Sequence, residues 1–308
     1  MAAKRKSRRR RKAGLFRRCW SLIATPEGRH RLGVFTITIL VLALALGVGW
    51  GLQRLERFVR KDRSEHQTGI TLRLLHQPAW MQRFGDLPQE ILASAGITPD
   101  DFILDKALAR RTGEKLAENP WIRRLRRVSK QPDNTLLIDC EFRRPLTAVR
   151  HQDVYYLVDD EGVRLPGVWK EHDLDSLGMK RLFGVASQPP VPGQRWEVED
   201  LAAGLKLLLL LEPHPYYRQI HAVHVDNFSG RKDPRRAHLT LTTPHATQIR
   251  WGRAAGTEGR LELPVRGKLE NLREVYEKFQ TLDGPLEYID LRDPQPRYRL
   301  RDPASPPT

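Results

Sequence analysis

Residues whose types and spacing could support chemistry are sparse in this chain of 308 residues. The sequence contains no G-x-S-x-G nucleophile elbow, no glycine-rich phosphate loop and no H-E-x-x-H metal motif. His221 and His224 lie three residues apart on an expected strand, so their side chains leave opposite faces and cannot share a metal. We therefore expect no catalytic residues, no metal and no cofactor, which favours a binding protein while leaving an enzyme open.

Two polar segments contain acids at suggestive spacings. "DDEG", Asp159 to Gly162, resembles a calcium loop superficially, but valine and leucine follow where such a loop needs oxygen ligands. We interpret it as a turn, and "DNFSGRKD", Asp226 to Asp233, as a surface loop. No acidic pair stands in the apolar setting that would raise a pKa for glycosidic chemistry.

The segment Glu118 to Pro145, "ENPWIRRLRRVSKQPDNTLLIDCEFRRP", is strongly basic and divides at the turn "KQPDN". After the turn, Leu136, Ile138, Cys140 and Phe142 alternate with more polar residues, as in a strand with one buried face. The sequence predicts a hairpin with Cys140 as a small buried residue and the arginines as a solvated basic face.

An apolar run from Leu32 to Leu52 contains no charge and no proline. As a helix, 21 residues extend about 31 Å, close to the roughly 30 Å hydrocarbon core of a bilayer. Of the net charge of +16, residues 1–31 contribute +11. Because basic residues beside a span stay in the cytoplasm, we expect a signal anchor with its N-terminus inside and the bulk of the chain outside. Nucleic-acid binding by the basic tail is the weaker alternative.

The two cysteines, Cys19 and Cys140, then lie on opposite sides of the membrane, so no intrachain disulfide is expected. The part outside the membrane must be held together by its own hydrophobic core.

Hydrophobic periodicity predicts an α+β fold outside the membrane. A strand near Ile70, two helices (residues 87–98 and 100–120) and the hairpin form the first unit. The second unit is a mostly antiparallel sheet that includes a hairpin about Asp160 to Gly162, with two covering helices (residues 197–212 and 263–282). The predicted organisation is a basic tail (1–31), a transmembrane helix (32–52), a linker (53–69), a first domain (70–145), a β domain (146–301) and a disordered end (302–308).

The final predicted strand, "RYRLR", follows Pro294 and Pro296. Proline donates no hydrogen bond to a ladder, so this strand belongs at a sheet edge. An exposed edge is either blunted or used to accept another chain's strand.

These parts, in this order, resemble the bacterial cell-division family FtsQ, also called DivIB. The resemblance rests on "LAENPWIRRL" followed by "PDNTLLIDCEFRRPLTAV", on "YYLVDDEGVRLP" and on "YIDLR", Tyr288 to Arg292. It covers about Ile70 to Arg301. Asp133 is an extra residue in the hairpin turn, and Asp293 stands where relatives often carry an aromatic residue.

The resemblance implies a POTRA-like first domain and a non-enzymatic scaffold of the division machinery in the inner membrane at the septum. Its partners would be coiled-coil membrane proteins like FtsB and FtsL, with other divisome components, and a weak homodimer remains open. The implied partner-binding residues are Arg292, Asp293, Arg297, Tyr298, Arg299 and Leu300. The implied recruitment strand is Leu125, Arg126, Arg127 and Val128.

Two further function classes stay open. An envelope assembly factor built on POTRA units would be expected to carry several such units and a barrel, and the sequence indicates one unit and no barrel. A membrane-anchored cell-envelope hydrolase would need a cleft with two converging carboxylates.

Overall fold

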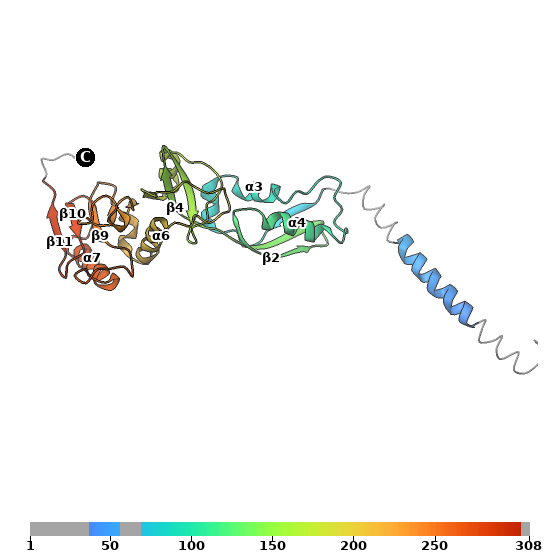
Figure 1. The fold of residues 1–308 in the computed structure, drawn as a ribbon. Helices are drawn as coiled ribbons and strands as arrows, with labels where there is room; N and C mark the ends of the chain where they lie inside the picture. Colours follow the sequence, from blue (N-terminus) through green and yellow to red (C-terminus); the bar gives the residue numbers. More distant parts are fainter. Residues whose placement is uncertain (1–36, 56–68, 303–308) are drawn as a thin grey trace, which may run out of the picture. The chain divides into compact units, whose positions relative to one another are not determined.

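The computed structural model describes residues 37–55 and 69–302, in two units that divide at Gly69. The described element of the first unit is a helix, Ile37–Leu55, which is 19 residues long and fully exposed (Figure 1). Its length and apolar composition suffice to cross a membrane. The helix runs three residues beyond the expected end at Leu52, while residues 32–36, the basic tail and most of the linker fall outside the described residues.

The second unit begins with a three-stranded sheet. Its strands are β1 (Thr71–Leu74), β2 (Ile122–Lys130) and β3 (Thr135–Phe142), in the order β1-β3-β2. β1 runs parallel to β3, whereas β2 runs antiparallel to it. The connection from β1 to β2 contains the 3-10 helix η1 (Ala79–Phe84) and the helices α3 (Leu87–Ala93) and α4 (Leu108–Ala117).

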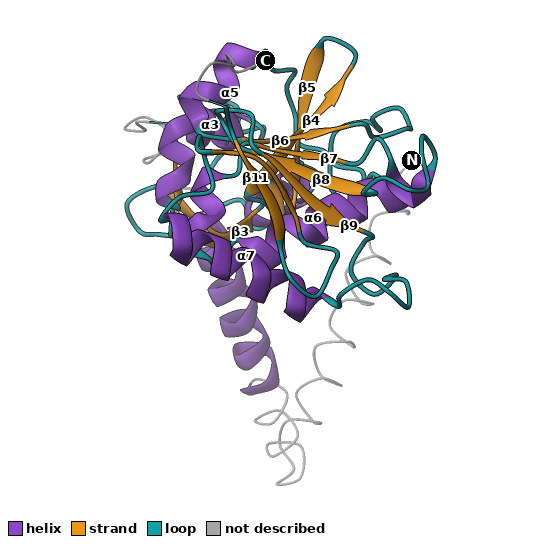
Figure 2. Ribbon diagram, turned by 90° about the vertical axis from the view of Figure 1, so that its left-hand side faces the viewer, coloured by secondary structure: helices purple, strands orange, loops and turns teal. Residues whose placement is uncertain are grey.

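The larger sheet has eight strands in the order β11-β10-β9-β8-β7-β6-β4-β5 (Figure 2). The strands are β4 (Pro145–His151), β5 (Val154–Asp159), β6 (Lys180–Phe183), β7 (Ala222–His224), β8 (Leu239–Thr242), β9 (Gln248–Gly252), β10 (Leu286–Asp290) and β11 (Arg297–Leu300). Four of the strand pairings are antiparallel and three are parallel, so the sheet is more mixed than the sequence predicts.

The parallel pairings follow from the helices that connect the strands. The chain passes from β6 to β7 through α6 (Glu199–Leu211) and the 3-10 helix η2 (Pro215–Gln219), and from β9 to β10 through α7 (Val265–Phe279). A helix that links two neighbouring strands returns the chain to the same end of the sheet, which makes the strands parallel. A shorter helix, α5 (Glu171–Leu177), precedes β6.

Two hydrophobic cores lie against the large sheet. In the first, α6 and α7 pack on the inner residues of β7 to β10. Leu208 of α6, Leu272 of α7, and Ile249 and Trp251 of β9 are all fully buried there. The second core joins the two sheets, because Ile138 of β3 clusters with Leu157 of β5. The described residues from Ile70 onward therefore form one compact unit.

The structure defines the register of the basic hairpin. Val128 pairs with Ile138 and Leu125 with Cys140, and two irregularities in β2 absorb the mismatch between the strands. Asn134 has a φ of 60° in the turn, a conformation that asparagine tolerates better than most residues. The extra turn residue is thus accommodated without shifting the buried face of β3.

Two local expectations differ from the structure. The second helix begins at Leu108 rather than near Asp100, because Asp101 and Asp105 accept backbone N–H groups and favour turns before it. The hairpin expected about Asp160–Gly162 forms only in part: the chain turns back there, with the Gly162 N–H bonded to the Asp159 carbonyl, but Val158 and Arg164 make an isolated antiparallel bridge instead of a ladder. The regular hairpin of this segment lies between β4 and β5, with the turn at Gln152 (φ 57°). Residues 163–169 make only isolated bridges.

Candidate functional site: the free edge of the large sheet

β11 is the terminal strand of the eight-stranded order and pairs only with β10 among the described strands (Figure 1). The sequence positions it there: Pro294 and Pro296 precede it and donate no backbone hydrogen bonds. Its outer side is therefore a row of backbone groups that no described strand covers.

The ladder identifies which backbone groups point outward. Arg301 donates its backbone N–H to the Pro285 carbonyl at 2.9 Å, and Arg299 and Arg297 pair with Tyr288 and Asp290. Since alternate residues of an antiparallel strand face the same neighbour, the backbone groups of the odd-numbered residues face β10. The N–H and C=O groups of Tyr298 and Leu300 then face the free edge.

The side chains of Tyr298 and Leu300 form an apolar strip along this edge. Tyr298 packs edge-on against Phe279 of α7, with ring centroids 5.2 Å apart, and accepts a hydrogen bond from Lys278 on its hydroxyl. Leu300 is 60% exposed. A strand laid against β11 would meet both outward backbone groups and an apolar side chain that is at present solvated.

The arginines at this edge are paired within the chain. Arg297 contacts Asp293 at 3.0 Å, and Arg299 contacts Glu287 of β10 at 3.1 Å. Their charges are therefore partly neutralised, so the edge offers mainly backbone groups and apolar surface to a partner. Exposed pairs of this kind contribute little to stability, which leaves them able to rearrange on binding.

Arg292 and Asp293 hold the connection between β10 and β11. Arg292 donates two hydrogen bonds to the Asp290 carboxylate, at 2.9 and 2.8 Å, and one to the Arg235 carbonyl at 3.0 Å. The bonds with Asp290 raise the pKa of Arg292 above its ordinary value. Asn271 of α7 donates to the Asp293 carbonyl at 3.0 Å. The guanidinium of Arg292 is thus engaged in fixing the loop.

No family model matches the sequence, and no curated protein matches it.

The second expected segment, Leu125 to Val128, lies in β2, at an edge of the other sheet. Leu125 and Val128 turn toward Gly113 of α4 and are half-buried. Arg126 pairs with Glu141, and Arg127 is exposed without an ion pair among the described residues. The two predicted binding segments therefore lie on different sheets, and the arginines form the accessible part of β2.

The acidic segment Asp159 to Gly162 stabilises a turn. Asp159 is fully buried and accepts hydrogen bonds from Arg143 at 2.7 Å and from the backbone N–H groups of Glu161 and Val163. Its carboxylate closes the turn that the sequence predicts. Within residues 37–55 and 69–302, no group of three or more His, Cys, Asp or Glu side chains could hold a metal ion.

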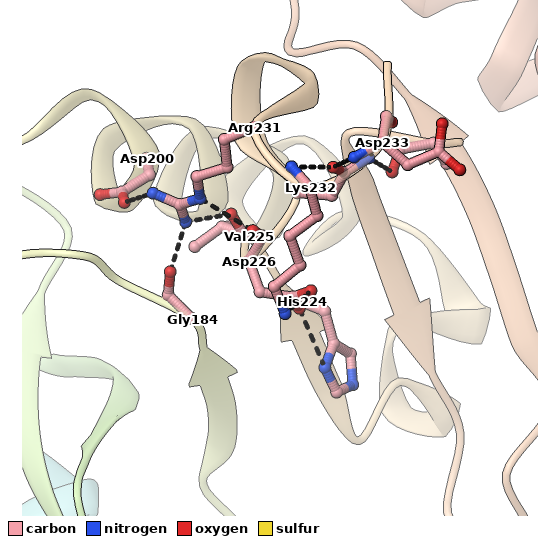
Figure 3. A network of polar contacts seen from close by, with 10 residues as sticks. Gly184, Asp200, His224, Val225, Asp226, Arg231, Lys232 and Asp233 are labelled. Atoms are coloured by element: carbon pink, nitrogen blue, oxygen red, sulfur yellow. Dashed lines mark hydrogen bonds and ion pairs between the residues drawn. The ribbon is translucent and has the colours of Figure 1, made fainter. Parts of the chain in front are cut away.

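The loop Asp226–Asp233 is organised around Arg231 (Figure 3). Arg231 donates to the Asp200 carboxylate at 2.9 Å and to the carbonyls of Asp226, Val225 and Gly184. Asp200, in the first turn of α6, also accepts the Ala186 N–H at 3.0 Å. This network ties the loop after β7 to α6, a role that a polar loop sequence does not reveal.

Sequence reasoning missed a hollow on the uncovered face of β7 to β9, which we call the open-face pocket. Its volume is about 770 Å³, and its floor consists of His224, Thr240, Thr242, Gln248 and Arg250. The sequence pattern does indicate a polar second face on these strands. In "LTLT" (239–242) and "QIRW" (248–251), the residues that alternate with buried ones are all polar.

Proposed function

We propose that this chain is a non-enzymatic, single-pass scaffold of the bacterial division machinery, resembling FtsQ. In this proposal the N-terminus is cytoplasmic and the unit from Ile70 onward lies outside the inner membrane at the septum. The unit binds FtsB-like coiled-coil proteins by strand addition at β11. The observation that carries the proposal is the free edge of β11, with the backbone groups of Tyr298 and Leu300 facing outward.

Two other features support it. The order strand, helix, helix, strand, strand over 71–142 is the order expected of a POTRA-like domain. The apolar helix Ile37–Leu55 is long enough for the membrane anchor that such a scaffold needs. The basic strand β2 is then the proposed recruitment surface for other division proteins.

The test compares two substitutions at one position. Both substitutions remove the phenol ring and its hydroxyl bond to Lys278, and Tyr298→Pro alone also removes the outward N–H. We expect the full-length alanine variant to retain binding to an extracytoplasmic FtsB-like peptide, weakened by lost packing, and the proline variant to lose at least about tenfold more, because a peptide hydrogen bond and the fit of the added strand are both lost. Equal binding by the two variants would reject strand addition at β11.

A cellular readout tests the wider proposal. A fluorescent fusion of the full chain should gather at midcell before constriction, and the Tyr298→Pro variant should arrive there without bringing its FtsB-like partner. Uniform distribution of the wild-type fusion around the membrane would contradict a division role, whatever the peptide experiment shows.

A further inference from the structure

The large sheet has a face that only part of the fold covers. Near β4, β5 and β6 this face carries the second core, including Ala148, Tyr155 and Leu157. Over β7, β8 and β9 it bears polar side chains instead, and these form the floor of the open-face pocket. The 770 Å³ hollow is within the size range of sites that hold small molecules.

The charges around the open-face pocket do not balance. Each acid that lines it already has a partner: Asp226 pairs with Lys232 at 2.9 Å and Asp233 with Arg236 at 3.3 Å. Arg250 and Arg235 form no ion pair among the described side chains. Arg250 lies 4.1 Å from the centre of the Tyr288 ring, a contact that leaves its charge in place. The acid nearest to it in the neighbouring strand, Asp290, already pairs with Arg292 at 2.8 Å. The pocket thus keeps positive charge for an anion.

The other floor residues are neutral hydrogen-bonding groups. His224 bonds Thr242 at 3.1 Å and stacks on Phe183 with ring centroids 5.0 Å apart. Burial lowers the pKa of His224 below its ordinary value, so this side chain is neutral near pH 7. Thr240 and Gln248 have side chains without described partners and can each donate and accept hydrogen bonds. Such groups suit the hydroxyls of a sugar.

We propose that the open-face pocket binds a saccharide that carries a carboxylate or a phosphate. Arg250 and Arg235 would hold the anionic group, because guanidinium groups match the geometry of both anions. Thr240 and Gln248 would bond the sugar hydroxyls. An acidic peptide would also satisfy the arginines, and it is the competing ligand in the experiment below. Anionic sugars are also the chemistry of envelope polymers, which fits a chain with a candidate membrane anchor.

The experiment measures ligand binding to the full-length protein in uncharged detergent micelles by saturation-transfer NMR and calorimetry. The probes are N-acetylmuramic acid, glucose 6-phosphate, N-acetylglucosamine and inorganic phosphate. We expect saturable binding of at least one of the two anionic sugars below about 10 mM, and weaker binding of the neutral sugar and of phosphate alone. Which anionic sugar binds tighter distinguishes a carboxylate from a phosphate ligand.

Variants locate the site. Arg250→Gln should weaken the anionic sugar about tenfold or more, as loss of a charge-assisted hydrogen bond predicts. Thr240→Val should weaken the sugar but leave phosphate binding unchanged. The control, Arg266→Gln, removes an exposed arginine of α7 that pairs with Glu270 and should change nothing.

Four results would overturn the proposal: no saturable binding of either anionic sugar, phosphate binding as tightly as the anionic sugars, an Arg250→Gln variant that binds normally, or displacement of the sugar by an acidic peptide of higher affinity. The last would assign the pocket to a protein partner. The sugar-binding result and the β11 result can be told apart, because the two experiments alter different residues. Tyr298→Pro changes the edge of β11, whereas Arg250→Gln and Thr240→Val change the floor of the pocket.

Discussion

Asp159 is the residue on which the junction between the two sheets depends. Its fully buried carboxylate binds Arg143, the residue after β3, and two N–H groups of the following turn. Arg143 also reaches Glu161 at 2.8 Å, and Glu161 binds Arg123 of β2 at 2.8 Å. These ion pairs connect both strands of the basic hairpin to the large sheet.

Asp159→Asn should lower the free energy of unfolding by about 3 kcal/mol, because it removes the buried one of the two carboxylates that compensate the largely buried Arg143 guanidinium. Glu161→Gln, at a half-exposed position, should cost no more than about 1 kcal/mol. Urea titration of the two full-length variants, followed by tryptophan fluorescence, measures the difference. Equal losses would mean that Asp159 contributes no more than a surface pair.

Cys140 provides a chemical test of burial. The residue is 6% exposed, and burial, with a smaller contribution from Asp139, raises the pKa of its thiol to about 11. At pH 8 only about one thiol in a thousand would then be ionised. In a Cys19→Ser background, we expect a thiol reagent to leave the native protein unmodified and to label it fully in urea. Rapid labelling of the native protein would contradict the packing of β3.

At the scale of elements, two helical glycines show how closely each helix approaches its sheet. A Cβ on Gly204 of α6 would lie 2.5 Å from Leu182 Cδ1 and 3.2 Å from Val225, both in the core under the helix. A Cβ on Gly113 of α4 would meet Leu125 at 3.3 Å. Alanine favours a helix over glycine by about 1 kcal/mol at either site.

We therefore expect opposite effects from the same substitution. Gly204→Ala should destabilise the fold by about 1–3 kcal/mol, because overpacking exceeds the gain in helix propensity. Gly113→Ala should be neutral or slightly stabilising, since the tip of Leu125 can shift by a few tenths of an ångström. Adding Leu182→Val to Gly204→Ala should recover part of the loss. Thermal unfolding of the three variants and the wild type checks the order, and a stable Gly204→Ala protein would refute the close contact.

The elements show what sequence patterns could and could not predict. Amphipathic periodicity identified α7, the acids of the first turn and Pro213 identified α6, and the two prolines identified β11 as an edge strand, because these signals act within a few residues. The start of α4 was predicted about eight residues too early, because the side chains of Asp101 and Asp105 accept backbone N–H groups and favour turns there. The parallel pairing of β6 with β7 and the position of the open-face pocket depend on which strands become neighbours, which no local pattern encodes.

The second unit, taken whole, does not separate cleanly at Pro145. β4 begins there, only two residues after β3 ends at Phe142, and the second core contains residues from both sheets. We expect urea to unfold residues 70–301 in one transition, with Trp121 and Trp251 reporting the same midpoint in single-tryptophan variants. A fragment that ends at residue 145 should remain unfolded, because Ile138 and Cys140 would lose partners such as Leu157. Two separate midpoints would show that the sheets are independent domains.

Pairing at β11 also has a consequence for whatever binds there. A ninth strand would extend the open sheet without closing it. The added strand would then be the new edge strand, and its own unpaired backbone groups could bind a further strand. A one-to-one complex thus requires the bound strand to block pairing at its outer edge, for example with a proline, an inward-pointing lysine or a flanking helix. Without such a block, successive copies could stack into a filament.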